Sequence, residues 1–396
     1  MIFQAYNETA VRNLQLREMA DNLLENGDLT PPQYEQVKTV FPIALKQSNV
    51  FVRLGLFLFT SLCIGFSIAL IGWMAFQSTS DENNVGILCL FFGLSLTTIN
   101  EYMIKERHWY RQGSDNALCY AAVACFVWGF ALVFKIDDRV IWTLLTFVFL
   151  TIAAVRYGDP LLALGAFFAL MISVFEFFKE KENTFMALSF AWAGLSVGVY
   201  FWTKYMSKKE TLFYWKDCFM VLEKVGLAGF YLSLNYYFLA QRFENSFAYG
   251  YESELSNEGE NEILMPFSTL FALLTAFIPL IYLFLGIKNK DRTLWVMGGL
   301  GIAASILTYR HYHSIMPIEW ALTLAGIVFL ALAYFLMTYL KTPRAGFVYL
   351  PKQNKNGLIE ALVINQVLQQ TAAGAPDDSV KYGGGDFGGG GASGDF

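Results

Sequence analysis

Residues 54–76 read LGLFLFTSLCIGFSIALIGWMAF, an apolar run without a single charged side chain. A helix needs about 20 such residues to cross the hydrocarbon core of a bilayer, so this stretch predicts a membrane-spanning helix. The whole chain shares this character, because 55% of its residues are hydrophobic and only 15% are charged. An ordinary soluble domain is about 25% charged. The sequence therefore predicts an all-α integral membrane protein.

Nine further segments are apolar enough and long enough to cross a bilayer as part of a helical bundle. They predict a ten-helix transmembrane domain over residues 54–340. The ten segments are 54–76, 85–104, 117–134, 140–155, 160–178, 184–202, 218–240, 263–287, 293–309 and 320–340.

The distribution of lysine and arginine among the connections indicates the orientation. With ten spans, twenty of these residues lie on the side of the two termini and only six on the opposite side. Connections rich in lysine and arginine stay in the cytoplasm, so both termini are expected there. A miscount by one helix would scramble this alternation, which favours ten spans.

Residues 1–53 predict a cytoplasmic helical hairpin. Apolar residues recur at helical spacing from Thr9 to Asn26, and a second helix is expected to begin after Thr30 as N-cap and to continue to Leu45. Two interpretations remain open for this hairpin. It is either a docking module for a cytoplasmic partner or a soluble cap that packs its own apolar stripe.

The C-terminal part changes character after the last apolar segment. Residues 341–372 predict a short cytoplasmic amphipathic helix, and residues 373–396 form a glycine-rich tail that we expect to be disordered. Phe387 and Phe396, each next to an acidic residue (Asp386 and Asp395), are candidate anchors for docking to a partner. A low-complexity end without function explains the same pattern.

Composition and motifs exclude several functional classes. The net charge of −5, without a basic stripe, argues against nucleic-acid binding. The string from Gly194 to Gly198 matches a nucleophile elbow but falls within an expected helix, where small residues instead favour close helix packing. The same interpretation applies to Gly226 with Gly229 and to residues 298–301. No metal or cofactor site is predicted, and no catalytic motif indicates an enzyme.

Ionisable or polar residues near membrane depth are the candidates for a functional site. Residues seven apart share a helix face, so the charges at 216–217 and 223–224 predict either a polar path into the seventh span or solvated charges on an interfacial helix. Glu176 could couple to protons, although Lys179 offers a partner one turn away. Glu101 is likewise within reach of Lys105. The candidate polar site comprises Lys216, Asp217, Glu223, Lys224, Asn235 and Glu176.

Two segments resemble known families. The pattern LENGDLTPPQ at 24–33, in a hairpin before a polytopic domain, resembles bacterial inner-membrane proteins of a domain family of unknown function. The stretch FGGGGASG at 387–394 is similar to the C-terminal ends of bacterial membrane proteins with a TPM domain, whose tails end in Trp where this chain ends in Gly-Asp-Phe. The TPM domain itself is absent. These resemblances imply a bacterial inner (plasma) membrane and no catalytic residue.

Three functional hypotheses follow. The favoured one is an integral-membrane scaffold or accessory protein, embedded in the lipid bilayer, that engages a membrane or cytoplasmic protein through its hairpin and tail. The second is a small-solute transporter with two inverted five-helix halves, in which Pro279 could interrupt a helix. The third, an intramembrane enzyme, would need polar residues such as Glu176 and Asn235 to converge.

Overall fold

The computed structural model describes residues 4–25, 29–43, 45–46, 48–78, 82–179, 185–235 and 268–313, with scattered positions between 320 and 338. Most of these residues are helical, and the sole extended pairing among them is an isolated bridge between Lys46 and Trp109. The chain divides into two compact units, and the division falls within the first helix. One unit comprises 1–18 with 42–352, and the other comprises 19–41 with 353–396.

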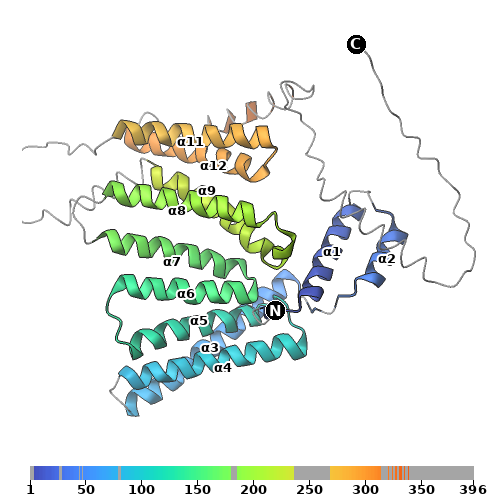
Figure 1. The fold of residues 1–396 in the computed structure, drawn as a ribbon, viewed down its shortest axis with the longest axis vertical. Helices are drawn as coiled ribbons and strands as arrows, with labels where there is room; N and C mark the ends of the chain where they lie inside the picture. The colour runs from blue at the N-terminus through green and yellow to red at the C-terminus, as the bar shows by residue number, and fades with distance from the viewer. Residues whose placement is uncertain are drawn as a thin grey trace, which may run out of the picture. The chain divides into compact units, whose positions relative to one another are not determined.

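Twelve helical elements are described, and Figure 1 labels most of them. Two belong to the N-terminal hairpin, α1 (Glu8–Glu25) and α2 (Pro31–Val40). The others are α3 (Val50–Ser78), α4 (Glu82–Arg107), α5 (Ser114–Val133), α6 (Arg139–Tyr157), α7 (Pro160–Lys179), α8 (Phe185–Met206), the short 3₁₀ helix η1 (Glu210–Trp215), α9 (Lys216–Leu234), α11 (Ser268–Asn289) and α12 (Arg292–His313).

Seven of the described helices are long and apolar enough to cross a membrane, namely α3, α4, α5, α6, α7, α8 and α11. The fold class is therefore confirmed as all-helical with membrane-compatible helices. The predicted segments at 218–240 and 293–309 overlap α9 and α12, which are helical but are not among these seven, and residues 236–240 lie outside the described part of the chain. The segment at 320–340, the helix at 341–372 and the tail at 373–396 lie largely or wholly outside the described residues.

The helices of the larger unit pack mainly on their neighbours in the sequence. Close pairs form between α4 and α5, α6 and α7, α8 and α9, and α11 and α12. Figure 1 shows these helices stacked in sequence order, from α4 and α5 through α6 and α7 to α11 and α12. Because each helix uses a near neighbour in the chain, short connections are sufficient to assemble the stack.

Glycines allow two of these pairs to approach closely, as the sequence predicted. A methyl group at Gly226 would lie 2.9 Å from the carbonyl oxygen of Ser196, and one at Gly298 would lie 2.8 Å from Leu283. The expectation for Gly194 and Gly198 is wrong within the described part of the chain, because a methyl group at either position meets nothing within 4 Å there. These two glycines lie on a face of α8 that no described helix covers.

Pro279 does not interrupt its helix. It lies inside α11, which is assigned as one helix from 268 to 289. A methyl group at Gly301 of α12 would lie 2.9 Å from the ring of Pro279, so the proline ring packs into the space that this glycine leaves. Neighbouring helices in a bundle commonly make an internal proline tolerable in this way.

The N-terminal hairpin has a small core within the second unit. Ala20 and Val37 are fully buried against Leu29, Tyr34 and Phe41. The N-cap at Thr30 is confirmed, and its backbone N–H donates to Oε1 of Gln33 at 3.0 Å. The predicted extension to Leu45 is wrong, because α2 ends at Val40. Pro42 follows and cannot donate a helical hydrogen bond, and Leu45 packs in the core of the larger unit instead.

Candidate functional site at one end of the bundle

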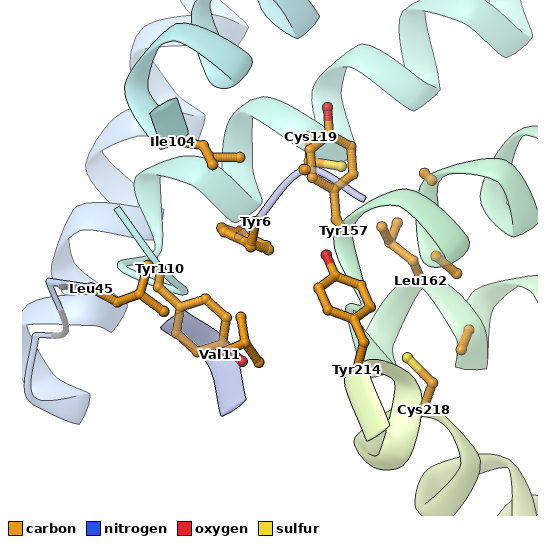
Figure 2. Packing of buried hydrophobic residues seen from close by; sticks show 14 of the residues in the cluster. Tyr6, Val11, Leu45, Ile104, Tyr110, Cys119, Tyr157, Leu162, Tyr214 and Cys218 are labelled. Carbon is orange, nitrogen blue, oxygen red and sulfur yellow. The ribbon is translucent and has the colours of Figure 1, made fainter. Parts of the chain in front are cut away.

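Three of the six ion pairs described for the larger unit gather where α4 and α6 end and where α5, α7 and α9 begin. Figure 2 shows the same region, in which Tyr6, Tyr110, Tyr157 and Tyr214 converge from segments far apart in the sequence. The four tyrosines belong to one buried cluster. We call this region the end network, and its charged members are Glu101, Arg111, Asp115, Arg156, Asp159 and Asp217.

Arg111 joins three elements of the end network. Its Nη1 donates to Oδ2 of Asp217 at 2.6 Å, and its Nη2 donates to the carbonyl oxygen of Gly158 at 3.0 Å. Burial alone would lower the pKa of the guanidinium, but Tyr110 and Asp217 outweigh that effect and the pKa is raised above its ordinary value. Arg111 therefore stays charged and ties the connection after α4 to the C-terminus of α6 and the start of α9.

Two buried carboxylates lie at helix N-termini. Asp115, 1% exposed, accepts from the backbone N–H groups of Gly113 and Asn116, both at 3.0 Å, and from the Tyr6 hydroxyl at 3.2 Å. Asp159 accepts from the N–H of Leu161 at 2.7 Å and from the Tyr120 hydroxyl at 2.8 Å. Free N–H groups and the helix dipole favour negative charge at these positions, which explains how the bundle tolerates both.

Glu101 is paired across two helices. Its Oε1 accepts from Nε of Arg156 at 2.6 Å and from the hydroxyl of Tyr157 at 3.2 Å. The partner expected from the sequence, Lys105, lies farther away at 3.7 Å. Sequence spacing finds the partner on the same helix, but it cannot find the closer one on α6.

The N-terminal segment packs against the end network. The N–H of Ala5 donates to the carbonyl oxygen of Arg156 at 2.9 Å, and the ring of Tyr6 meets that of Tyr110 edge-on at 4.9 Å. Desolvation, followed by the charge of Asp115, raises the pKa of Tyr6 well above its ordinary value. Desolvation also raises the pKa of Tyr110 and Tyr214. The hydroxyls stay protonated at neutral pH, and those of Tyr6 and Tyr214 donate to Asp115 and to the carbonyl oxygen of Arg156.

The space inside the end network is very small. A cavity of about 10 Å³ is lined by Tyr6, Asn100, Arg111, Asp115, Asn116, Cys119, Tyr157 and Asp159. Sites for small-molecule ligands usually enclose about 300–1,000 Å³, and this volume suits about one water molecule. Oδ1 of Asn100 and Nε of Arg111 have no hydrogen-bond partner among the described residues. The geometry is that of a packed structural junction.

The charged residues predicted on α9 do not converge on one cavity. Asp217 pairs with Arg111, whereas Glu223 lies 3.9 Å from Lys204, whose Nζ is nearer to Asp291 at 3.0 Å. Lys216 lies over the ring of Phe213 at 5.6 Å, and Lys224 is exposed. The sequence gives no signal that Arg111, Lys204 and Asp291 are partners in these ion pairs, because each comes from a connection or helix other than α9.

Asn235 and Glu176 lie in different surroundings. Asn235, 2% exposed at the end of α9, donates to the Tyr231 hydroxyl at 2.9 Å and accepts from Thr308 at 3.3 Å. Glu176 lies 3.9 Å from Lys179, the partner expected from the sequence. The tail residues Asp386, Phe387, Asp395 and Phe396 lie outside the described residues.

Neither the described side chains nor the known proteins assign a chemistry to the end network. The described residues hold no cluster of three or more His, Cys, Asp or Glu side chains able to bind a metal ion. No family model matches the chain, and neither the curated proteins nor the solved structures contain a match.

Proposed function

We propose that this chain is an integral scaffold or accessory protein of a bacterial inner membrane, whose hairpin and tail engage protein partners in the cytoplasm. The observation that carries the proposal is the pairing of charges in the end network. Arg111 with Asp217 and Arg156 with Glu101 are each joined at 2.6 Å, and the cavity that Arg111 lines has a volume of only about 10 Å³. Charges arranged in this way hold helices together and leave no room for a substrate.

The packing order supports the same proposal. The helices of the larger unit pair with sequence neighbours, which builds a stack and does not interleave two halves around a shared centre. Transporters with inverted repeats instead bind their substrates at the interface of the two halves. Helices stacked in sequence order, with ion pairs joining them in the end network, are well suited to hold the hairpin and the tail at a membrane surface.

The proposed topology has ten spans with both termini in the cytoplasm. The lysine and arginine distribution supports it, and seven described helices meet the requirements of a span by themselves. In the proposal α9 and α12 cross as partners of α8 and α11, with which they pack closely. The tenth span is the segment 320–340.

A small-solute transporter is the second candidate, and one observation favours it. Between α9, α11 and α12 the Tyr231 hydroxyl contacts the carbonyl oxygen of Gly301 at 3.1 Å and Oγ of Ser305 at 3.0 Å, and Tyr231 also accepts from Asn235. Buried polar groups inside a membrane protein are costly unless they serve packing or a function. Here each is hydrogen-bonded within the protein.

Affinity purification from native membranes tests the scaffold proposal. The full-length protein is compared with a chain ending at Tyr382 and with one in which residues 19–41 are replaced by a Gly-Ser linker of equal length. At least one co-purifying protein is expected to fall about tenfold or more in one of these variants, as removal of about 1.4 kcal/mol of binding energy would produce. Mass spectrometry quantifies the proteins captured.

The matched control is Glu35→Gln with Lys38→Gln, which removes an exposed ion pair of α2 and keeps the buried core of the hairpin. This control should retain the partner. Identical protein lists from the full chain and from both truncated or replaced variants would contradict the scaffold proposal. Solute uptake that Asn235→Leu abolishes would then favour the transporter.

A further inference from the structure

A second cavity lies within the membrane-compatible part of the bundle. It has a volume of about 380 Å³ and lies between α3, α4 and α5. It is therefore much larger than the 10 Å³ cavity of the end network. Its lining is almost entirely apolar, with the ring of Tyr120 and the small side chain of Ser61 as the exceptions. The residues that line it are Phe57, Ser61, Ile64, Gly65, Ile68, Cys89, Ala117, Tyr120, Ala121, Ala124, Cys125 and Trp128. We call it the α3 groove.

The loose packing of α3 creates the groove. At its start α3 touches the N-terminus of α5 so closely that a methyl group at Gly113 would lie 2.1 Å from the carbonyl oxygen of Arg53. Farther along, the most apolar window of α3 contains no buried residue. The helix is thus fixed at one end, whereas farther along Ile64 and Ile68 are only partly buried against residues of α4 and α5.

The length of the groove matches one leaflet. Along α3 the lining runs from Phe57 to Ile68, which is about 16 Å at the rise of an α-helix. Half of the hydrocarbon core of a bilayer is about 15 Å thick. An acyl chain that enters at the Phe57 end would therefore reach the Ile68 end near the bilayer midplane.

Cationic residues without an acidic partner stand beside the entrance. Arg53 lies one helical turn before Phe57 and is half-buried. Lys46 is held nearby, because its carbonyl oxygen accepts from Nε2 of Gln112 at 3.0 Å, next to Gly113. Neither Arg53 nor Lys46 forms an ion pair within the described part of the chain. Their charges are available to an anion at headgroup depth.

We propose that the α3 groove binds one anionic phospholipid, with an acyl chain between α3 and α5 and the phosphate beside Arg53 and Lys46. The apolar lining selects a hydrocarbon chain over water, and the cations select an anionic headgroup over a zwitterionic one. This site goes beyond the scaffold function. It needs only the membrane insertion of α3, α4 and α5.

The test is native mass spectrometry of the full chain after reconstitution with phosphatidylglycerol or phosphatidylcholine. Gly65→Leu places an apolar side chain in the groove, because Gly65 lines it and a methyl group there meets nothing within 4 Å. The wild type should retain one phosphatidylglycerol after delipidation. Gly65→Leu should reduce this retention about tenfold or more, since the leucine side chain takes the place of most apolar contacts of the acyl chain.

Gly72→Leu is the matched control, because Gly72 also meets nothing within 4 Å and lies on α3 outside the groove. It should retain the lipid as the wild type does. Arg53→Gln should keep the bound chain but reduce the preference for phosphatidylglycerol about fivefold, whereas Arg139→Gln at the opposite end of the bundle should not.

Equal lipid retention by Gly65→Leu and Gly72→Leu would overturn the proposal. So would the absence of bound lipid from the wild type. Finding the segment 320–340 or a second copy of the chain cross-linked to Ile64→Cys would identify a different occupant and would also overturn it.

Discussion

Arg111→Ala is expected to lower the stability of the bundle by about 3 kcal/mol. Breaking a buried ion pair costs about 3–5 kcal/mol because the remaining charge stays desolvated, and partial exposure moves the value to the low end of this range. The two side chains are 20% and 30% exposed. The variant also leaves the carbonyl oxygen of Gly158 without its donor. Thermal unfolding in detergent, followed by tryptophan fluorescence, measures the change.

A double variant distinguishes the loss of the Arg111–Asp217 ion pair from a general loss of packing. Arg111→Met with Asp217→Leu removes both charges and should recover most of the stability lost by Arg111→Ala, since no isolated charge remains. Lys38→Met is the control for an exposed pair, and should change stability by less than about 1 kcal/mol. If the double variant is as unstable as Arg111→Ala, the cost comes from lost packing and the ion-pair explanation is wrong.

Gly113→Ala is expected to detach α3 from α5 and to destabilise the bundle by about 2–5 kcal/mol. Gly113 has a φ of +99°, a conformation that residues with a side chain rarely adopt. The added methyl group would lie 2.1 Å from the carbonyl oxygen of Arg53. Backbone strain and overpacking each contribute about 1–3 kcal/mol. Protease sensitivity of the connection before α3, together with the unfolding temperature, measures the effect.

Gly194→Ala provides the matched control for this substitution. Gly194 lies in the middle of α8, and a methyl group there meets no described atom within 4 Å. Alanine has the higher helix propensity, so this variant should be as stable as the wild type or slightly more stable. A Gly113→Ala protein with wild-type stability would show that the start of α3 does not pack on α5 as described.

Helix positions could be predicted from the sequence because they depend on local signals. A continuous apolar run such as 54–76 needs no partner to be recognised, and Thr30 with Pro31 indicates a helix start by itself. The end of α2 was placed too late, because Leu45 continues the apolar spacing although it packs elsewhere. Glycine spacing was an incomplete guide, since Gly226 contacts α8 closely whereas Gly194 contacts no described helix.

The partners within the end network could not be predicted. Asp217 was identified as a candidate, but its partner Arg111 lies in a connection two helical pairs earlier in the stack. Glu101 was assigned to Lys105 one turn away, whereas Arg156 of α6 is closer. Tyr6 gave no signal at all, because a single tyrosine in a polar N-terminus has no periodicity. Such contacts depend on the tertiary arrangement and have no local pattern.

The start of the hairpin is anchored in the same buried cluster as the tyrosines of the end network. Residues 4–14 are fixed to the larger unit by Ala5, Tyr6 and the buried side chains of Val11 and Leu14. This anchoring joins the first turns of α1 to the buried cluster that contains Tyr110, Tyr157 and Tyr214. We therefore expect substitutions at Arg111 to reduce partner capture in the purification experiment as well as stability.

The scaffold proposal requires the hairpin and the tail to lie in the cytoplasm, and thiol labelling measures this orientation directly. Lys208→Cys and Asp137→Cys are introduced separately into a chain whose five natural cysteines are replaced. Both positions are exposed, the first in the connection after α8 and the second in the connection before α6. An impermeant maleimide is added to bacterial spheroplasts before and after permeabilisation.

We expect Asp137→Cys to react in intact spheroplasts and Lys208→Cys to react only after permeabilisation, because connections rich in lysine and arginine stay in the cytoplasm. Labelling of Lys208→Cys in intact spheroplasts would place the hairpin and the tail outside the cell. That result would contradict the proposed scaffold of cytoplasmic partners.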